Sequence, residues 1–174
     1  MFLDGLEDAY EKGRLMGSFA EDCAEKYQFT REAQDDYALR SLMRAREAQS
    51  SGAFENEITP FNLARKKGDY AVMQDEQPLN AKPEKIPHLK PAFRADGSVT
   101  AANASSISDG AAALIVSSQT HMQQAGLPCR ARILGHASHA QEPAWFSTAP
   151  IFAPRNLLDR LNSRGEAADL WGVN

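Results

Sequence analysis

The side chains best suited to chemistry in this 174-residue sequence are two cysteines and four histidines. Nucleophilic acyl transfer needs a cysteine or serine beside a histidine, together with donors that stabilise an oxyanion. Cys23 and Cys129 lie far apart and form no Cys-x-x-Cys pattern. Cys23 falls on a predicted helix among apolar neighbours, and Cys129 follows a Gly-Leu-Pro turn. We therefore interpret both as structural residues rather than nucleophiles.

The histidines do not form an evident catalytic or metal centre. His88 falls in a proline-rich segment, and His121 falls on a predicted surface helix. His136 and His139 could bind a metal together, but residues three apart in an extended segment point to opposite faces. No carboxylate or cysteine follows at a matching spacing, so a metal site there is disfavoured. Serine-hydrolase, Walker A and dinucleotide-binding motifs are also missing from the sequence.

Small residues crowd the segment 101–110, which is the one stretch whose composition favours close approach of another group to the backbone. One interpretation is tight packing between a strand and a helix. The other is a ligand that lies across exposed backbone N–H groups and serine hydroxyls. The residues by themselves leave both interpretations open.

The composition is that of an ordinary globular protein. Hydrophobic residues make up 43% and charged residues 24%, with a formal net charge of -4. A chain so near to neutral lacks the basic surface of nucleic-acid-binding proteins, so we expect no nucleic-acid partner. No apolar run approaches the roughly 20 residues of a membrane span, and the first residues do not resemble a signal peptide. Two separated thiols favour a cytoplasmic location.

The hydrophobic pattern predicts an α/β protein whose helices lie mainly in the first half. Ser18 and Thr30 are predicted to begin the first two helices, and Gly52 to end the second. The second helix should bury a stripe that begins at Tyr37. A proline-rich loop is expected at 75–88. The pattern predicts helices at 18–27, 30–52, 118–125 and 154–161, and extended segments at 58–61, 70–73, 111–116, 130–137 and 169–173.

Several motifs resemble those of the thiolase family. Gly-Ser-Val-Thr-Ala-Ala-Asn-Ala-Ser at 97–105, followed by Asp-Gly-Ala-Ala-Ala at 109–113, is similar to the thiolase segment Gly-Thr-Val-Thr-Ala-x-Asn-Ala-Ser-x-x-x-Asp-Gly-Ala-Ala-Ala. Further thiolase-like landmarks follow the family's order along nearly the whole chain: Asp4-Gly5-Leu6, Met16-Gly17 with Ala20-Glu21, Arg31-Glu32-x-Gln34-Asp35, Glu57-Ile58, Leu89-Lys90-Pro91-Ala92-Phe93 and Trp171-Gly172-Val173-Asn174.

This resemblance implies an incomplete thiolase-like α/β fold. Residues 1–96 would form the coenzyme A-binding loop region, and residues 97–174 the start of the C-terminal α/β half. The full-length enzyme would be a homodimer or homotetramer that transfers acyl groups between acyl-CoA and coenzyme A. The family's nucleophilic cysteine, catalytic histidine and second cysteine find no counterpart in this chain, so we expect it to be inactive alone. Two alternatives are a stand-alone coenzyme A-binding module and a subunit completed by a second chain.

The resemblance also implies roles for individual residues. Ser105 would hydrogen-bond the pantetheine part of coenzyme A, and Ala101 would contact it through its backbone. Leu6, Met16 and Phe93 would line the groove. Other implied roles are an oxyanion-hole water at Asn174, coenzyme A phosphate contacts at Lys85 and Lys90, and a potassium ion near Tyr37, Ala101, Ala102 and Ala104.

Two departures from the family concern the acyl pocket. Leu15 stands where many thiolases have a histidine before Met-Gly. Residues 146–150 read Phe-Ser-Thr-Ala-Pro where many have Met-Gly-Thr-Gly-Pro, a form that resembles acetoacetyl-CoA thiolases of the mitochondrial type. The preferred acyl chain therefore stays undetermined.

Overall fold

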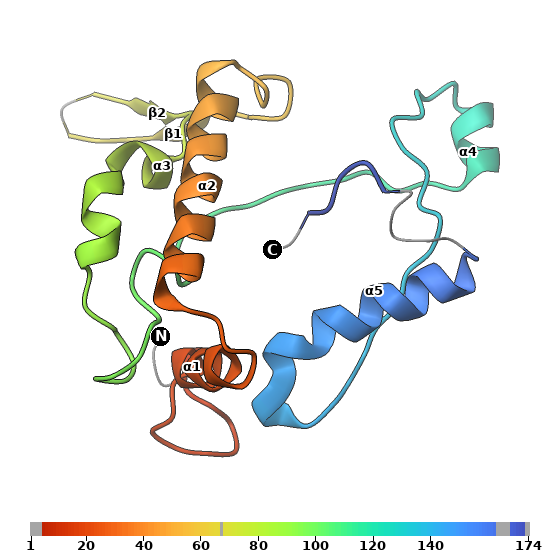
Figure 1. Cartoon of the computed structure of the whole chain (residues 1–174). Helices are drawn as coiled ribbons and strands as arrows, with labels where there is room; N and C mark the ends of the chain where they lie inside the picture. The colour runs from red at the N-terminus through yellow and green to blue at the C-terminus, as the bar shows by residue number, and fades with distance from the viewer. Residues whose placement is uncertain (1–4, 67, 163–167, 173–174) are drawn as a thin grey trace. The chain divides into compact units, whose positions relative to one another are not determined.

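The computed structural model describes residues 5–66, 68–162 and 168–172. The chain forms two compact units, Met1–Ser106 and Ile107–Asn174. Figure 1 shows the first unit as the helices α1 (Met16–Lys26) and α2 (Arg31–Ser50) with a small hairpin, and the second as an extended chain with helices α4 (Gln119–Gln124) and α5 (Ala149–Arg160). The first unit extends past Asp96 to Ser106, because the segment after Gly97 is hydrogen-bonded to α1 and α2.

Helix α1, Met16–Lys26, begins two residues before the predicted start. Its N-cap is Leu15, and no side chain caps it, so the prediction that Ser18 begins the helix is wrong. Glu21 is buried, together with Phe19 and Ala24, and its carboxylate bonds to a distant segment. Phe19 and Glu21 are two positions apart and leave the helix on nearly opposite sides, so α1 buries residues on more than one side.

Helix α2, Arg31–Ser50, follows a short turn and matches its predicted span. The backbone N–H of Ala33 donates to Thr30 Oγ1 at 3.1 Å, which confirms the predicted N-cap. Gly52 follows the helix with φ +71°, a conformation that glycine adopts without strain. The predicted burial of Tyr37 is wrong, since Tyr37 is 62% exposed and the buried residue of the helix is Asp35.

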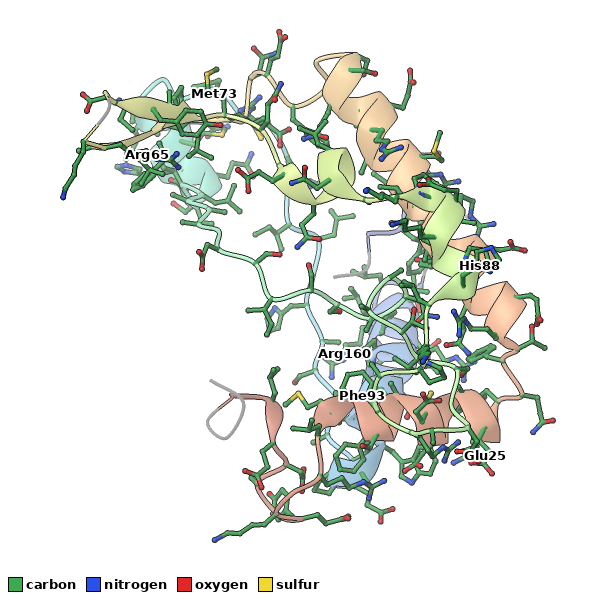
Figure 2. All side chains as sticks on the ribbon, turned by 90° about the vertical axis from the view of Figure 1, so that its left-hand side faces the viewer. Glu25, Arg65, Met73, His88, Phe93 and Arg160 are labelled. Atoms are coloured by element: carbon green, nitrogen blue, oxygen red, sulfur yellow. The ribbon has the colours of Figure 1, made fainter. Side chains whose placement is uncertain are left out.

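The strands β1, Phe61–Leu63, and β2, Tyr70–Val72, form an antiparallel hairpin. Phe61 pairs with Val72 and Leu63 with Tyr70. The predicted strand at 58–61 is therefore displaced toward the turn. At that turn the Arg65 guanidinium lies 4.9 Å from the centroid of the Tyr70 ring (Figure 2).

The segment predicted as a proline-rich loop contains a short helix α3, Glu76–Asn80, and a 3-10 helix η2, Pro83–His88. Two arginines of α2 hold these elements. Arg46 donates to the carbonyl oxygens of Pro78 at 2.8 Å and Ala81 at 2.7 Å. Arg31 donates to those of Ile86 and Leu89. Such long-range side-chain contacts are not encoded in local sequence, which explains why the loop prediction was wrong.

The second unit contains α4, Gln119–Gln124, the 3-10 helix η3, Pro143–Thr148, and α5, Ala149–Arg160. Ser118 Oγ accepts from the backbone N–H of His121 at 3.2 Å, as expected for its predicted cap position. Helix α5 starts earlier than predicted, so Pro154 lies inside it and Pro150 takes the favourable place in the first turn.

None of the three strands predicted for the second unit forms in its described residues. In the predicted strand 111–116, Leu114 is 92% exposed and Ile115 is 95% exposed. A strand exists only when another strand supplies its hydrogen bonds. Thr148 is the only buried residue within the described part of this unit. In the described residues of this unit, the segments that were predicted as strands stay extended and form no sheet.

Candidate ligand-binding site

Two buried carboxylates hold the segment that begins at Ser98. Glu21, which is 1% exposed, accepts hydrogen bonds from the backbone N–H of Ser98 at 2.9 and 3.0 Å and from that of Val99 at 2.8 Å. It also accepts from Ser98 Oγ at 3.2 Å. A charge is tolerated in the interior only when such bonds replace water. The segment at 98–99 is therefore fixed to α1.

The second buried carboxylate, Asp35, is 4% exposed and fixes the same segment to α2. It accepts from Arg31 Nε at 2.7 Å and from Asn103 Nδ2 at 3.0 Å. Asn103 in turn accepts from the Thr100 N–H at 2.7 Å and donates to the Ser98 carbonyl at 3.1 Å. Asn103 is thus bonded to α2 and to the residues that lead into its own turn.

These bonds close a tight turn whose outer residues are free to meet a ligand. Thr100 is fully buried, and its Oγ1 accepts from the N–H of Ala102 at 3.2 Å. Its carbonyl accepts from the N–H of Ala104 at 3.0 Å. Ala101 and Ser105 are exposed. The turn therefore offers small residues and a hydroxyl on a rigid base.

Leu6, Met16 and Phe93 are brought into one region of the first unit. Glu7 and Leu15 form an antiparallel bridge, which places Leu6 near the start of α1, where Met16 is the first residue. A Cβ atom at Gly17 would overlap the Phe93 ring, so the ring lies directly on α1. Figure 2 shows Phe93 against this helix.

The turn and the apolar residues are neighbours. The backbone N–H of Ala92 donates to the Val99 carbonyl at 2.9 Å, which places Phe93 next to the start of the turn. Apolar side chains beside a few polar groups are the usual lining of a site for a small molecule. The structure therefore brings the turn and these apolar side chains into one region of the first unit.

An arginine next to these residues is permanently charged. Arg14 precedes the bridge, and its guanidinium lies 3.9 Å from the centroid of the Phe19 ring. Its hydrogen bond to Glu11, aided by the charge of Glu11 and Asp22, raises the pKa of Arg14 despite some loss of hydration. Arginine is protonated at physiological pH in any case. The ion pairs with Glu11 and Asp22 balance the positive charge of Arg14.

Among the other predicted residues, Tyr37 points away from Asp35 and its contact with Asn103. Tyr37 is two positions from Asp35 on α2, so it leaves the helix on nearly the opposite side from the contact with Asn103. Lys85 and Lys90 are exposed. Asn174 lies outside the described residues. The potassium site and the oxyanion-hole role stay predictions.

The cysteines and histidines form no metal centre within the described ranges. Cys23 is half-buried on α1, and Cys129 is exposed. His139 stacks on Phe152 with ring centroids 4.7 Å apart and lies 3.2 Å from Gln141 Oε1. These contacts are of the kind that support a fold.

Sequence reasoning missed the roles of Glu21, Asp35 and Asn103. A local clue to Asp35 exists, since Arg31 stands four residues before it and can pair with it on one helix face. For Glu21 no local clue exists, because its partners lie 77 and 78 residues further along the chain.

Comparison with known proteins identifies the class to which this fold and site belong. The family model "Thiolase, N-terminal domain" matches residues 1–120. The chain therefore belongs to the thiolase family, with an incomplete thiolase-like α/β fold. The matched range runs past Asp96 and includes the turn at 100–104.

Two relatives show which members of the family this chain resembles. The chain is 43% identical over 172 residues to a probable acetyl-CoA acetyltransferase of Dictyostelium discoideum, covering 98% of this chain and 41% of that protein. It is 44% identical over 176 residues to an acetyl-CoA acetyltransferase of Pseudomonas aeruginosa, covering 100% and 44%. This chain thus spans less than half the length of these relatives.

Two crystal structures show the same similarity in three dimensions. An acetyl-CoA acetyltransferase of Bacillus anthracis has a TM-score of 0.91 at 38% identity, covering 97% of this chain and 43% of that one. A thiolase of Ascaris suum, solved in complex with coenzyme A, has a TM-score of 0.87 at 39% identity with the same coverage.

Among the described residues, no helix is both long and apolar enough to cross a membrane.

Proposed function

We propose that this chain supplies the coenzyme A-binding part of a thiolase that transfers acetyl groups between acyl-CoA and coenzyme A. The observation that carries this proposal is the convergence of Met16, Phe93 and the turn at 100–104 in one region. Support comes from the relatives, which are named acetyl-CoA acetyltransferases, and from a similar thiolase solved with coenzyme A.

In this proposal each residue of the site has one role. The Ser105 hydroxyl bonds to an amide of the pantetheine chain, and the Ala101 backbone lies against it. Leu6, Met16 and Phe93 provide the apolar side of the groove. Their exposure and proximity support these roles.

The isolated 174-residue chain is proposed to bind its ligand without turning it over. Within the described residues, neither Cys23 nor Cys129 has the hydrogen-bond partners of an activated thiolate. The chemistry would come from thiolase sequence beyond these residues, whether joined to this chain or carried by a second one. In the whole enzyme we expect a homodimer or homotetramer, with Asn174 holding the oxyanion-hole water.

The division into domains and the location in the cell are also proposals. The division of the chain after Asp96 into a coenzyme A-binding region and the start of the C-terminal half is a statement about function, while the compact unit extends to Ser106. The cytoplasmic location rests on the two separated thiols, and one relative is named as mitochondrial.

Isothermal titration calorimetry of the 174-residue chain with coenzyme A tests the proposal. We expect saturable binding, and we expect Phe93→Ala to weaken it by about tenfold because the ring supplies apolar contact. Phe54→Ala is the matched control, since Phe54 is an exposed aromatic of the same unit outside the proposed site. Its affinity should equal that of the unchanged chain.

Two results would contradict the proposal. Equal losses for both phenylalanine variants would mean that Phe93 has no special place in the site. Turnover of acetoacetyl-CoA by the purified chain, or acetylation of either cysteine, would show that this chain carries chemistry of its own.

A further inference from the structure

Two negative charges lie in the interior of the first unit, and the proposed function uses neither of them directly. Glu21 and Asp35 come from successive helices, α1 and α2, and both direct their oxygens at the segment 98–103. Glu21 receives four hydrogen bonds from Ser98 and Val99. We call this set of contacts, with Asn103 on Asp35, the carboxylate clamp.

We propose that the carboxylate clamp positions the ligand-facing turn, so that Glu21 and Asp35 are positioning residues for the binding of coenzyme A. This inference rests on the proposed function for the identity of the ligand. Neither carboxylate is accessible to the ligand, because both are almost fully buried. They act through Ser98, Val99 and Asn103, which lead directly to Ala101 and Ser105.

The physical reason lies in the strength and direction of the bonds. Hydrogen bonds to an ionised acceptor are about twice as strong as neutral ones, and they fix the direction of the donor N–H groups. The two anchors come from two different helices, so they fix both the position and the orientation of the turn. A turn held in its bound conformation loses less entropy when the ligand arrives.

The clamp is itself held in place from outside. Arg31 bonds to Asp35 and also donates to the carbonyl oxygens of Ile86 and Leu89. Gln34 Nε2 donates to Ser98 Oγ at 2.8 Å, so α2 reaches both ends of the segment. Arg31 therefore connects the anchor of the turn, Asp35, to the segment that leads to Phe93.

Three variants of the 174-residue chain test the inference. Glu21→Gln removes the negative charge and places an amide NH2 where Oε2 accepts from the Ser98 N–H and the Ser98 hydroxyl. Asn103→Ala removes the bond to Asp35, together with the side-chain bonds to Thr100 and Ser98, and leaves the Arg31–Asp35 ion pair intact. Arg46→Gln is the matched control, because it breaks two bonds from α2 to Pro78 and Ala81, far along the helix from the turn.

Two readouts are combined, both at a temperature where circular dichroism shows unchanged helix content. Amide hydrogen exchange reports how firmly residues 98–104 are held, and calorimetry reports affinity for coenzyme A. We expect Glu21→Gln and Asn103→Ala each to accelerate exchange at 98–104 and to weaken binding by about tenfold or more. Arg46→Gln should change neither.

The inference is overturned if exchange at 98–104 is unchanged in both clamp variants, or if Arg46→Gln accelerates it equally. If Glu21→Gln does not fold, Asn103→Ala alone decides between these outcomes. If the unchanged chain binds no coenzyme A, the proposed function of this chain fails. The exchange data then still show whether the clamp holds the turn.

Discussion

At the scale of single residues, the clearest consequence of the structure concerns Gly97. Its position is crowded, because a Cβ atom would overlap the Glu21 carboxylate and lie 3.0 Å from the Arg94 carbonyl oxygen. The carboxylate cannot move aside without breaking its bonds to Ser98 and Val99. Glycine is therefore required here for close packing rather than for an unusual backbone angle.

We expect Gly97→Ala to lower the free energy of unfolding by about 2 kcal/mol, because one extra methyl group overfills a packed site. Urea denaturation of the chain measures this change. Gly5→Ala is the control, since nothing lies within 4 Å of a Cβ atom built there. A cost for Gly97→Ala no larger than that for Gly5→Ala would show that Glu21 has room to move.

Phe93 illustrates how one residue can be read in two ways. Its ring packs on Gly17, which is the behaviour of a core residue, and yet it stays exposed at the surface. Both observations fit a side chain that forms the wall of a groove. Calorimetry with coenzyme A on Phe93→Ala and Phe54→Ala distinguishes these two roles. Loss of a ligand contact lowers the affinity for coenzyme A at an unchanged free energy of unfolding, whereas loss of packing alone does not.

At the scale of elements, α2 is the organising helix of the first unit. Its side chains bond to η2, to α3 and the residues that flank it, and to the turn at 100–104. Each of these contacts depends on the helix beginning at the right residue, which Thr30 sets by capping it.

Thr30→Ala should lower the free energy of unfolding by about 1 kcal/mol, since the N–H of Ala33 then has no side-chain acceptor. Thr30→Ser keeps the hydroxyl and should be close to neutral. Chemical denaturation followed by circular dichroism compares the two. An equal cost for both variants would mean that the methyl group of Thr30, rather than its hydroxyl, stabilises the helix.

At the scale of the whole chain, the two units differ in how much they bury. The first unit has a mixed core that contains Phe19, Ile86 and Val99 beside the carboxylate clamp. In the described part of the second unit only Thr148 is buried. Apolar side chains such as Leu114 and Ile115 are exposed to solvent. Exposed apolar segments promote association between protein molecules.

We expect the purified chain to self-associate, with the segment 111–116 as the contact. Ile115→Lys places a charge in the middle of this segment and should reduce the associated fraction measured by light scattering. Lys substitution at the exposed Tyr10 of the first unit is the control. A sharp cooperative melt of an unchanged monomer would contradict this expectation.

Local sequence was sufficient to predict the features that depend on neighbours within a few residues. Terminal signals located α2 and α4, because the hydroxyls of Thr30 and Ser118 marked their first turns. The motif at 97–113 was enough to assign the family. These features are local because a helix satisfies its backbone hydrogen bonds within four residues.

Tertiary contacts, which local sequence does not specify, set the bonding partners of Glu21 and Asp35. They also explain why the predicted strand 111–116 does not form. Glu21 looks like a capping residue in sequence, yet its bonds go to Ser98 and Val99, far along the chain. The segment 111–116 has the composition of a buried strand, yet it stays extended and exposed. A buried charge and a β-strand both need partners from distant parts of a polypeptide, and local sequence does not say which partners are present.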